Sequence, residues 1–217
     1  MILITTYNRP RLLLRLLSQI DRQREDTVLV VDDGTPQEIE FEQYERIKVL
    51  YYRRDYNKGK KKYYQTVTEG FQQLRQIRFD DFWMLPDDVM ISDNFFERSL
   101  ELWDRIEDPQ KICLSTGHTF GRHLRGCWTN QKPVVMDDVV FTQWNDLCFY
   151  SKRQLLEEIF FETSVTHDRW AGNEELGSGV GADISRRLFK KGFNMYHVME
   201  SLVTFDNVPS QMFNEAT

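Results

Sequence analysis

The sequence predicts an α/β fold in which helices flank a mostly parallel central sheet. Short apolar runs alternate with helical patterns along the first hundred residues, and each run ends in polar or charged residues. Alternating strands and helices are typical of parallel sheets with right-handed crossovers. The 217 residues, of which 41% are hydrophobic, are enough for one domain with a sizeable core.

The first expected strand is the apolar run Ile2–Ile4. Asn8 is a suitable N-cap for the helix that follows, and Pro10 is tolerated in a first helical turn. Apolar residues then recur at helical spacing, which predicts a helix packed on the sheet: Leu12, Leu13, Leu16, Leu17 and Ile20.

Three further strands are expected at Thr27–Val31, Ile47–Tyr52 and Phe82–Leu85, with a helix over 60–76 before the last of them. In the second half we expect a helix through Phe95–Trp103, a strand at Ile112–Ser115, a helix from Asp183 and a strand at Phe193–Met199. Between them, 117–140 is expected to form a functional flap or a surface hairpin.

The composition argues against several classes of protein. A net charge of −6 and a pI of about 5.3 do not suit a sequence-independent nucleic-acid binder. No apolar stretch is long enough to span a membrane, and no signal peptide is evident. Three cysteines without CxxC spacing predict neither a disulfide framework nor a zinc site, so we expect a soluble protein in a reducing, cytoplasmic compartment.

Polar residues gather where successive strands are expected to end: Thr5–Asn8, Asp32–Asp33, Arg53–Arg54 and Asp87–Asp88. Ligands of open α/β sheets bind outside the carboxyl ends of the strands. Two adjacent carboxylates at that edge are suited to a hard divalent cation, which in turn would hold a phosphate. An ordinary Asp-rich turn is the alternative for any one of these segments.

Three segments, Ile4–Arg9, Val30–Gly34 and Leu85–Asp88, in this order and at this spacing, resemble the nucleotide-sugar half of a family 2-like GT-A glycosyltransferase. The resemblance implies one GT-A domain over 1–217, with nucleotide-sugar binding in 1–100 and acceptor binding in 101–217. The short chain is also similar to small glycosyltransferases that large algal viruses encode for capsid glycans.

The resemblance implies roles for particular residues. Thr5 and Tyr7 would line the nucleobase pocket, and Asp33 would accept the imide N–H of a uracil-type base. Asp87 would lie by the ribose and the metal, and Asp88 would coordinate Mn²⁺ or Mg²⁺. The family often has Asp-x-Asp here, so the adjacent acids leave the division of roles between Asp87 and Asp88 open.

A basic, Gly-containing turn precedes the helix expected over 60–76. Gly59 allows close backbone approach, and a helix N-terminus favours anions, so we expect Lys60 at the diphosphate, ahead of Lys58 and Arg54. A solvated basic turn is the alternative.

The family resemblance also implies a general base at the start of the helix that begins with Asp183. Asp183 is the first choice, although it could be a simple N-cap. Glu174, Glu175 and Asp146 are the alternatives for the base.

Near the end of the chain, Phe205 stands where the family often has a metal-binding histidine. The neighbouring Asp206 or His197 is a possible replacement ligand, or the metal has only Asp88, diphosphate oxygens and water. A lone histidine in an apolar strand is more often a core residue than a ligand.

The expected function is metal-dependent transfer of a hexosyl group from a UDP-sugar to a hydroxyl of a glycan or glycoprotein, with inversion. The alternatives are a sugar nucleotidyltransferase and a non-catalytic nucleotide-sugar-binding module. A nucleotidyltransferase would be expected to carry a Gly-rich, basic loop directly after the first strand, where this chain has Thr6–Arg9.

Overall fold

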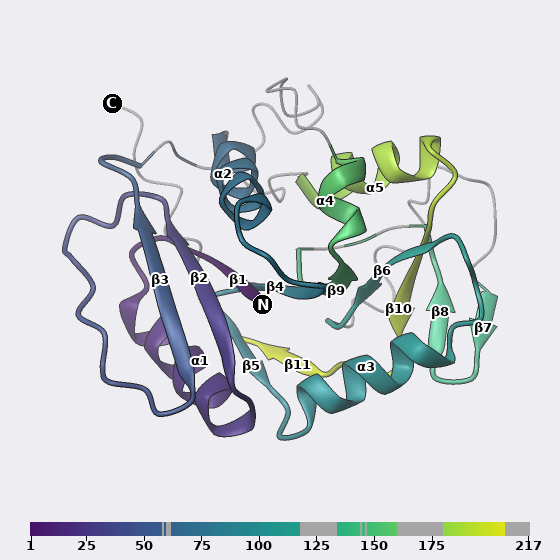
Figure 1. Cartoon of the computed structure of the whole chain (residues 1–217), viewed down its shortest axis with the longest axis horizontal. Coiled ribbons are helices and arrows are strands. Elements are labelled where there is room, and N and C mark those ends of the chain that lie inside the picture. Colours follow the sequence, from purple (N-terminus) through teal and green to yellow (C-terminus); the bar gives the residue numbers. More distant parts are fainter. Residues whose placement is uncertain are drawn as a thin grey trace.

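A computed structural model describes residues 1–57, 59, 62–117, 134–143, 145, 147–159 and 180–206. Its centre is a nine-stranded sheet with helices on both faces (Figure 1). Strands β8 and β9 run opposite to the other strands, so the predicted α/β fold with a mostly parallel central sheet is confirmed. The order across the sheet is β3 (Ile47–Arg53), β2 (Asp26–Asp32), β1 (Ile2–Thr6), β4 (Asp81–Pro86), β9 (Phe149–Lys152), β6 (Lys111–Ser115), β10 (Asn194–Val198), β8 (Val139–Phe141) and β7 (Val134–Met136).

Helices cover the two faces of the sheet and bury one core on each (Figure 1). Alternate residues of β1 serve different cores: Ile2 and Ile4 face the helices of one side, and Leu3 faces the other side. This alternation is the period-2 geometry of a strand. The first side carries α1 (Pro10–Gln23) and α3 (Phe95–Arg105), and the second carries α2 (Tyr63–Arg75), α4 (Gln154–Glu158) and α5 (Val180–Lys190).

Helix α1 begins as its proline predicts but is not capped as predicted. Arg9, not Asn8, occupies the N-cap position, and no side chain caps the helix. Asn8 has a φ of 51°, and its amide donates to Thr35 Oγ1 at 2.8 Å. Asparagine tolerates this left-handed conformation better than most residues. The prediction of Asn8 as a cap is therefore wrong, because the residue is used to turn the chain between β1 and α1.

A second, two-stranded sheet lies beside α1. It pairs β5 (Val89–Ile91) with β11 (Val203–Phe205) in antiparallel register. Just beyond this pairing, the amide of Asp206 donates to the carbonyl of Asp88 at 2.8 Å. The end of β11, near residue 206, therefore lies next to the Asp87–Asp88 segment, although the two are more than 100 residues apart in the sequence.

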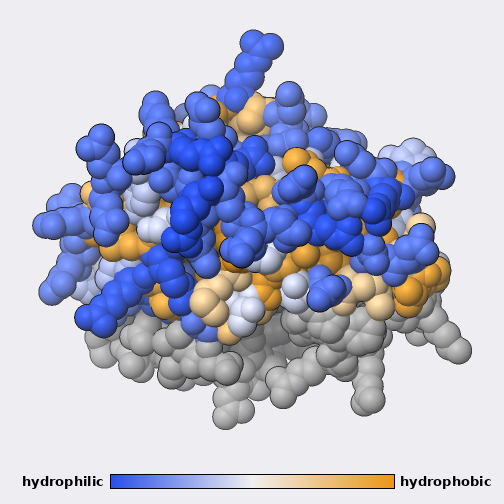
Figure 2. Space-filling model, turned by 90° about the horizontal axis from the view of Figure 1, so that it is seen from below, coloured by the Kyte–Doolittle hydropathy of each residue, from blue (hydrophilic) through white to orange (hydrophobic). Residues whose placement is uncertain are grey.

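Seen from the side of α1 and α3, the surface is mostly hydrophilic, with apolar residues between the hydrophilic ones (Figure 2). Amphipathic helices that turn an apolar face to a core produce such a surface. Within the described ranges, no helix has both the length and the apolar character needed to cross a membrane.

Candidate active site

A small pocket of about 130 Å³ opens where β1 and β4 end. These neighbouring strands are parallel, with Thr5 opposite Pro86, so the residues that follow them converge at one edge of the sheet. This is the edge at which open α/β sheets bind ligands. The lining residues are Thr5, Thr6, Tyr7, Arg9, Tyr63, Pro86, Asp87 and Asp88.

Asp87 is the buried acid of this pocket, and its carboxylate is fully engaged. Thr6 Oγ1 donates to Oδ2 at 2.7 Å, and Arg9 Nη1 donates to Oδ1 at 3.2 Å. Burial raises the pKa of Asp87 to about 7, even though Arg9 and the hydrogen bonds from Thr6 and the Tyr7 backbone lower it. Charges near this side chain therefore decide its protonation state at neutral pH.

Asp88 is the more accessible acid, with 24% of its side chain exposed against 7% for Asp87. Arg9 Nη1, the same nitrogen that contacts Asp87, donates to Asp88 Oδ2 at 2.7 Å. One guanidinium nitrogen therefore bridges the two carboxylates. A shared cation of this kind relieves the repulsion between adjacent acids.

The donor chemistry of this pair fits a hard divalent cation, because carboxylate oxygens are the ligands that Mg²⁺ and Mn²⁺ prefer. Across the described part of the chain, no group of three or more His, Cys, Asp or Glu side chains is placed to hold a metal. Asp88 would therefore need ligands from a bound diphosphate and from water. Mg²⁺ sites are commonly completed by substrate phosphates and water in this way.

Thr5 and Tyr7 line this pocket, and both are buried. The Thr5 hydroxyl forms a hydrogen bond of 2.6 Å with the Tyr63 hydroxyl of α2. Sequence reasoning missed Tyr63 and Arg9. Arg9 directly follows the Thr5–Asn8 segment, which was a usable signal, whereas only the packing of α2 brings Tyr63 to β1.

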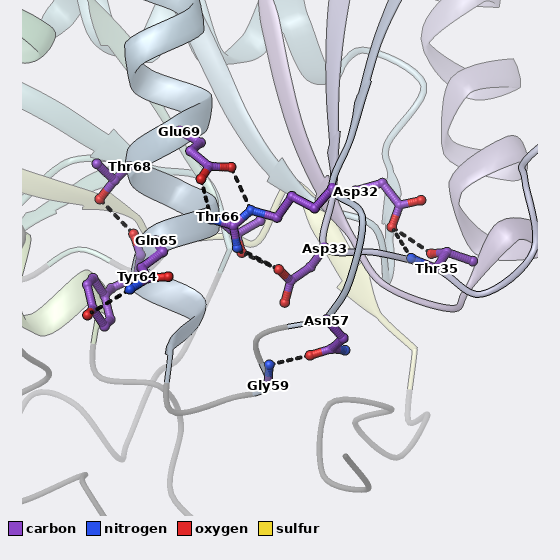
Figure 3. A network of polar contacts seen from close by, with 11 residues as sticks. Asp32, Asp33, Thr35, Asn57, Gly59, Tyr64, Gln65, Thr66, Thr68 and Glu69 are labelled. Carbon is purple, nitrogen blue, oxygen red and sulfur yellow. Dashed lines mark hydrogen bonds and ion pairs between the residues drawn. The ribbon is translucent and has the colours of Figure 1, made fainter. Parts of the chain in front are cut away.

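Asp33 lies beside this pocket but does not line it. It is fully buried, and its amide donates to the Thr6 carbonyl at 2.9 Å. Its Oδ1 accepts from Arg54 Nη1 at 2.7 Å and from Thr66 Oγ1 at 2.9 Å. Figure 3 shows Asp33 and Thr66 turned toward each other between β2 and α2.

Arg54 completes this buried network. Its Nε and Nη2 donate to the two carboxylate oxygens of Glu69, each at 2.6 Å, while Nη1 serves Asp33 and Thr66. All three guanidinium nitrogens are engaged, so we no longer expect Arg54 at a diphosphate. Thr66 and Glu69 were also missed by the sequence analysis, although their spacing on α2 places them on one face.

The turn after Asp33 depends on Gly34. Its φ is +80°, and a Cβ there would lie 2.4 Å from the carbonyl carbon of Tyr56. Glycine is required both by the left-handed conformation and by the close approach. The turn holds Asp33 against the segment that follows β3.

Asp183 lies in the first turn of α5 but does not begin that helix, which starts at Val180. Its two carboxylate oxygens pair with Arg186 at 2.7 Å and with Arg187 at 2.8 Å, both on the same helix. The prediction that the helix starts at Asp183 was wrong by about one turn, because the helix already begins at Val180. The role of Asp183 as the general base stays a prediction. Two sets of candidates lie outside the described residues: Asp146, Glu174 and Glu175 for the base, and Lys58 and Lys60 for the diphosphate.

Asp206 reaches the neighbourhood of Asp88 through its backbone. Its carboxylate forms an ion pair with Arg15 of α1, which also donates to the Val89 carbonyl at 3.4 Å. His197 is buried in β10, opposite Val140 of β8. Asp206 therefore supports the Asp88 segment through Arg15 and β11.

Similarity to known proteins agrees with this geometry. The sequence model of Glycosyl transferase family 2 matches residues 1–166. No curated protein matches the sequence. Among solved structures, S. aureus TarS 1-349 in complex with UDP-GlcNAc has a TM-score of 0.59 and 11% identity, over 100% of this chain and 61% of that one.

A mycobacterial protein is similar at a TM-score of 0.58 and 12% identity, over 96% of this chain and 67% of that one. A further structure of S. aureus TarS has a TM-score of 0.58 and 13% identity, over 98% of this chain and 37% of that one. The chain thus spans less than two thirds of the TarS structures, and at identities this low the structural likeness shows a shared fold alone. The match to the family model covers most of the sequence, and the chain therefore belongs to glycosyl transferase family 2.

Proposed function

We propose that the chain is a metal-dependent glycosyltransferase that moves a hexosyl group from a UDP-sugar to a glycan hydroxyl, with inversion. The observation that carries the proposal is the convergence of Asp87 and Asp88 with Thr5 and Tyr7 in one pocket at the edge of the sheet. The UDP-GlcNAc complex of TarS, which has the same fold, supports a UDP-sugar as donor.

The nucleotide would lie across the ends of β1 and β2. Thr5 and Tyr7 would flank the base, and Asp33 would accept its imide N–H. The support for Asp33 is that Arg54 and Thr66 fix its carboxylate before any ligand arrives. A charge held in place in this way costs little reorganisation on binding. Lys60 is proposed for the diphosphate.

Asp88 would hold Mn²⁺ or Mg²⁺, with Asp87 next to it near the ribose. The ion, when bound, would supply Lewis-acid stabilisation of the negative charge on the departing diphosphate. Thr6 would keep the Asp87 carboxylate oriented toward the pocket.

The acceptor would bind in the half formed by 101–217. Asp183 would take the proton of the acceptor hydroxyl, which would attack the anomeric carbon from the face opposite the diphosphate. Its pairs with Arg186 and Arg187 hold the carboxylate in one orientation, and that orientation supports a fixed role.

Incubation with a panel of nucleoside diphosphate sugars and Mn²⁺ tests the proposal. We expect slow hydrolysis of a UDP-sugar, which Asp88→Asn abolishes. Release of pyrophosphate from UTP and a sugar 1-phosphate would instead indicate a nucleotidyltransferase. Donor binding with neither hydrolysis nor transfer to any acceptor would indicate a binding module.

Asp183→Asn tests the general base once an acceptor is known. We expect donor affinity to be unchanged and transfer to fall by about 100-fold or more, the usual contribution of a general base. Lys190→Gln is the control, because it removes an exposed charge from the same helix and leaves Asp183, Arg186 and Arg187 in place. Unchanged transfer in Asp183→Asn would assign the base to another carboxylate.

A further inference from the structure

We infer that Arg9 is an internal counter-cation of the Asp87–Asp88 pair, which opposes metal binding until the diphosphate of the donor arrives to take the guanidinium. The inference rests on the proposed function and assigns to this residue the coupling between metal and donor. It makes Arg9 a positioning residue whose charge decides the order in which the site fills.

The positive charge of Arg9 lies against the same two carboxylates that would bind a metal. A single nitrogen, Nη1, lies 3.2 Å from Asp87 Oδ1 and 2.7 Å from Asp88 Oδ2. The side chain is only 12% exposed, so solvent screens the contact weakly. The guanidinium thus already supplies the positive charge that two neighbouring acids require.

The backbone leading to Arg9 explains how the side chain reaches this position. The left-handed Asn8, held by Thr35, turns the chain at the end of β1, and Pro10 then starts α1. Arg9 therefore follows β1 by a few residues, and the acids follow the neighbouring strand β4. The short turn between β1 and α1 therefore brings Arg9 to the two acids without a long loop.

A divalent cation on Asp88 would lie within a few ångströms of this guanidinium. Two positive charges on one carboxylate pair repel by several kcal/mol even at an effective dielectric constant of about 20, so both would need a counter-anion to stay there. Diphosphate oxygens in the pocket supply that anion. Arginine pairs with phosphate oxygens in the same way as it pairs with carboxylates, so it can exchange one partner for the other.

The consequence is a thermodynamic coupling between the two ligands. Metal alone must displace Arg9 without compensation, whereas metal with a diphosphate gives Arg9 a new partner. Because linkage is reciprocal, UDP would then tighten Mn²⁺ binding by the same factor by which Mn²⁺ tightens UDP binding.

Titration of the full chain with Mn²⁺, followed by electron paramagnetic resonance of the free ion, measures this coupling without relying on turnover. We expect Arg9→Met to bind Mn²⁺ alone about tenfold more tightly than the wild type. Saturating UDP should tighten Mn²⁺ binding by about tenfold or more in the wild type and by much less in Arg9→Met.

Two variants control for folding and for general electrostatics. Arg9→Lys keeps the charge and is expected to behave much like the wild type. Arg11→Met removes an exposed charge two residues away on α1 and should leave both Mn²⁺ titrations unchanged. An Arg9→Met protein that binds Mn²⁺ alone no more tightly than the wild type does would overturn the inference.

The same titrations separate this inference from the proposed function. If Asp88→Asn abolishes Mn²⁺ binding in the presence of UDP while Arg9→Met matches the wild type, the metal site stands and the inference about Arg9 is wrong. If UDP binds but Mn²⁺ affinity is the same in all variants, both the proposed metal dependence and the coupling fail.

Discussion

Two pairs of adjacent aspartates lie at the ends of the strands on either side of β1, and the fold places them in different surroundings. Asp33, after β2, is fully buried in a network with Arg54, Thr66 and Glu69. Asp88, after β4, is partly exposed and meets Arg9 through a single nitrogen. The same local pattern therefore yields a fixed acid in one place and an exchangeable acid in the other.

The difference follows from how the countercharge is held. All guanidinium nitrogens of Arg54 are engaged, and two of them donate parallel hydrogen bonds to Glu69. Release of Arg54 would therefore leave the negative charges of Asp33 and Glu69 without their partner. Arg9 bridges two acids that face a pocket, where a metal and a phosphate can replace it. A buried network is suited to preorganisation, and a bridged, accessible pair is suited to ligand exchange.

The largest effect on stability is expected where the buried network loses its cation. Arg54→Met would leave Asp33 and Glu69 without their shared partner, which should lower the free energy of unfolding by about 3–5 kcal/mol. Urea denaturation measures this change. Arg53→Met is the control: that side chain is exposed and donates to backbone carbonyls, so its loss should cost about 1 kcal/mol or less.

A smaller effect is expected from Gly34→Ala, which tests whether the turn after β2 must pass so close to Tyr56. The left-handed conformation alone costs about 1–2 kcal/mol for alanine, and the clash with the Tyr56 backbone adds to that. Gly192→Ala is a matched control, because Gly192 has a φ of +86° but nothing described lies within 4 Å of its Cβ position.

Thermal or urea unfolding of the two variants isolates the contribution of the close contact. If Gly34→Ala and Gly192→Ala lower the free energy of unfolding equally, the turn at Gly34 relaxes easily. The conclusion that this turn holds Asp33 rigidly would then be wrong.

The smallest effect on stability is expected from Asp88→Asn. This substitution keeps the shape of the side chain and leaves Arg9 paired with Asp87, so the free energy of unfolding should change by less than about 1 kcal/mol. Mn²⁺-supported binding of UDP, measured by calorimetry, should nevertheless be lost. Strong destabilisation by Asp88→Asn would show that this pair is as structural as the Asp33 network, and the contrast would disappear.

Much of this arrangement could be predicted from local patterns. Strands β1, β2, β3, β4, β6 and β10, the helix that begins with Pro10 and the positions of Thr5, Tyr7, Asp87 and Asp88 at one edge follow from apolar runs and from the parallel topology that their alternation with helices implies. Arg54 was a lesser candidate for the diphosphate, behind Lys60, because the sequence does not show which acid a basic residue after a strand pairs with. Glu69 lies 15 residues later and reaches it only because α2 packs beside β2.

The sequence by itself determined which edge of the sheet carries the chemistry, because alternating strands and helices make successive strands parallel and polar residues then mark their carboxyl ends. Only the tertiary structure decided which acid is buried and which is open, because burial depends on the helices that cover each strand end. The same packing brought Arg9 onto Asp87 and Asp88 and Arg54 onto Asp33. Contacts of this kind join residues that are remote along the chain, and no local pattern encodes them.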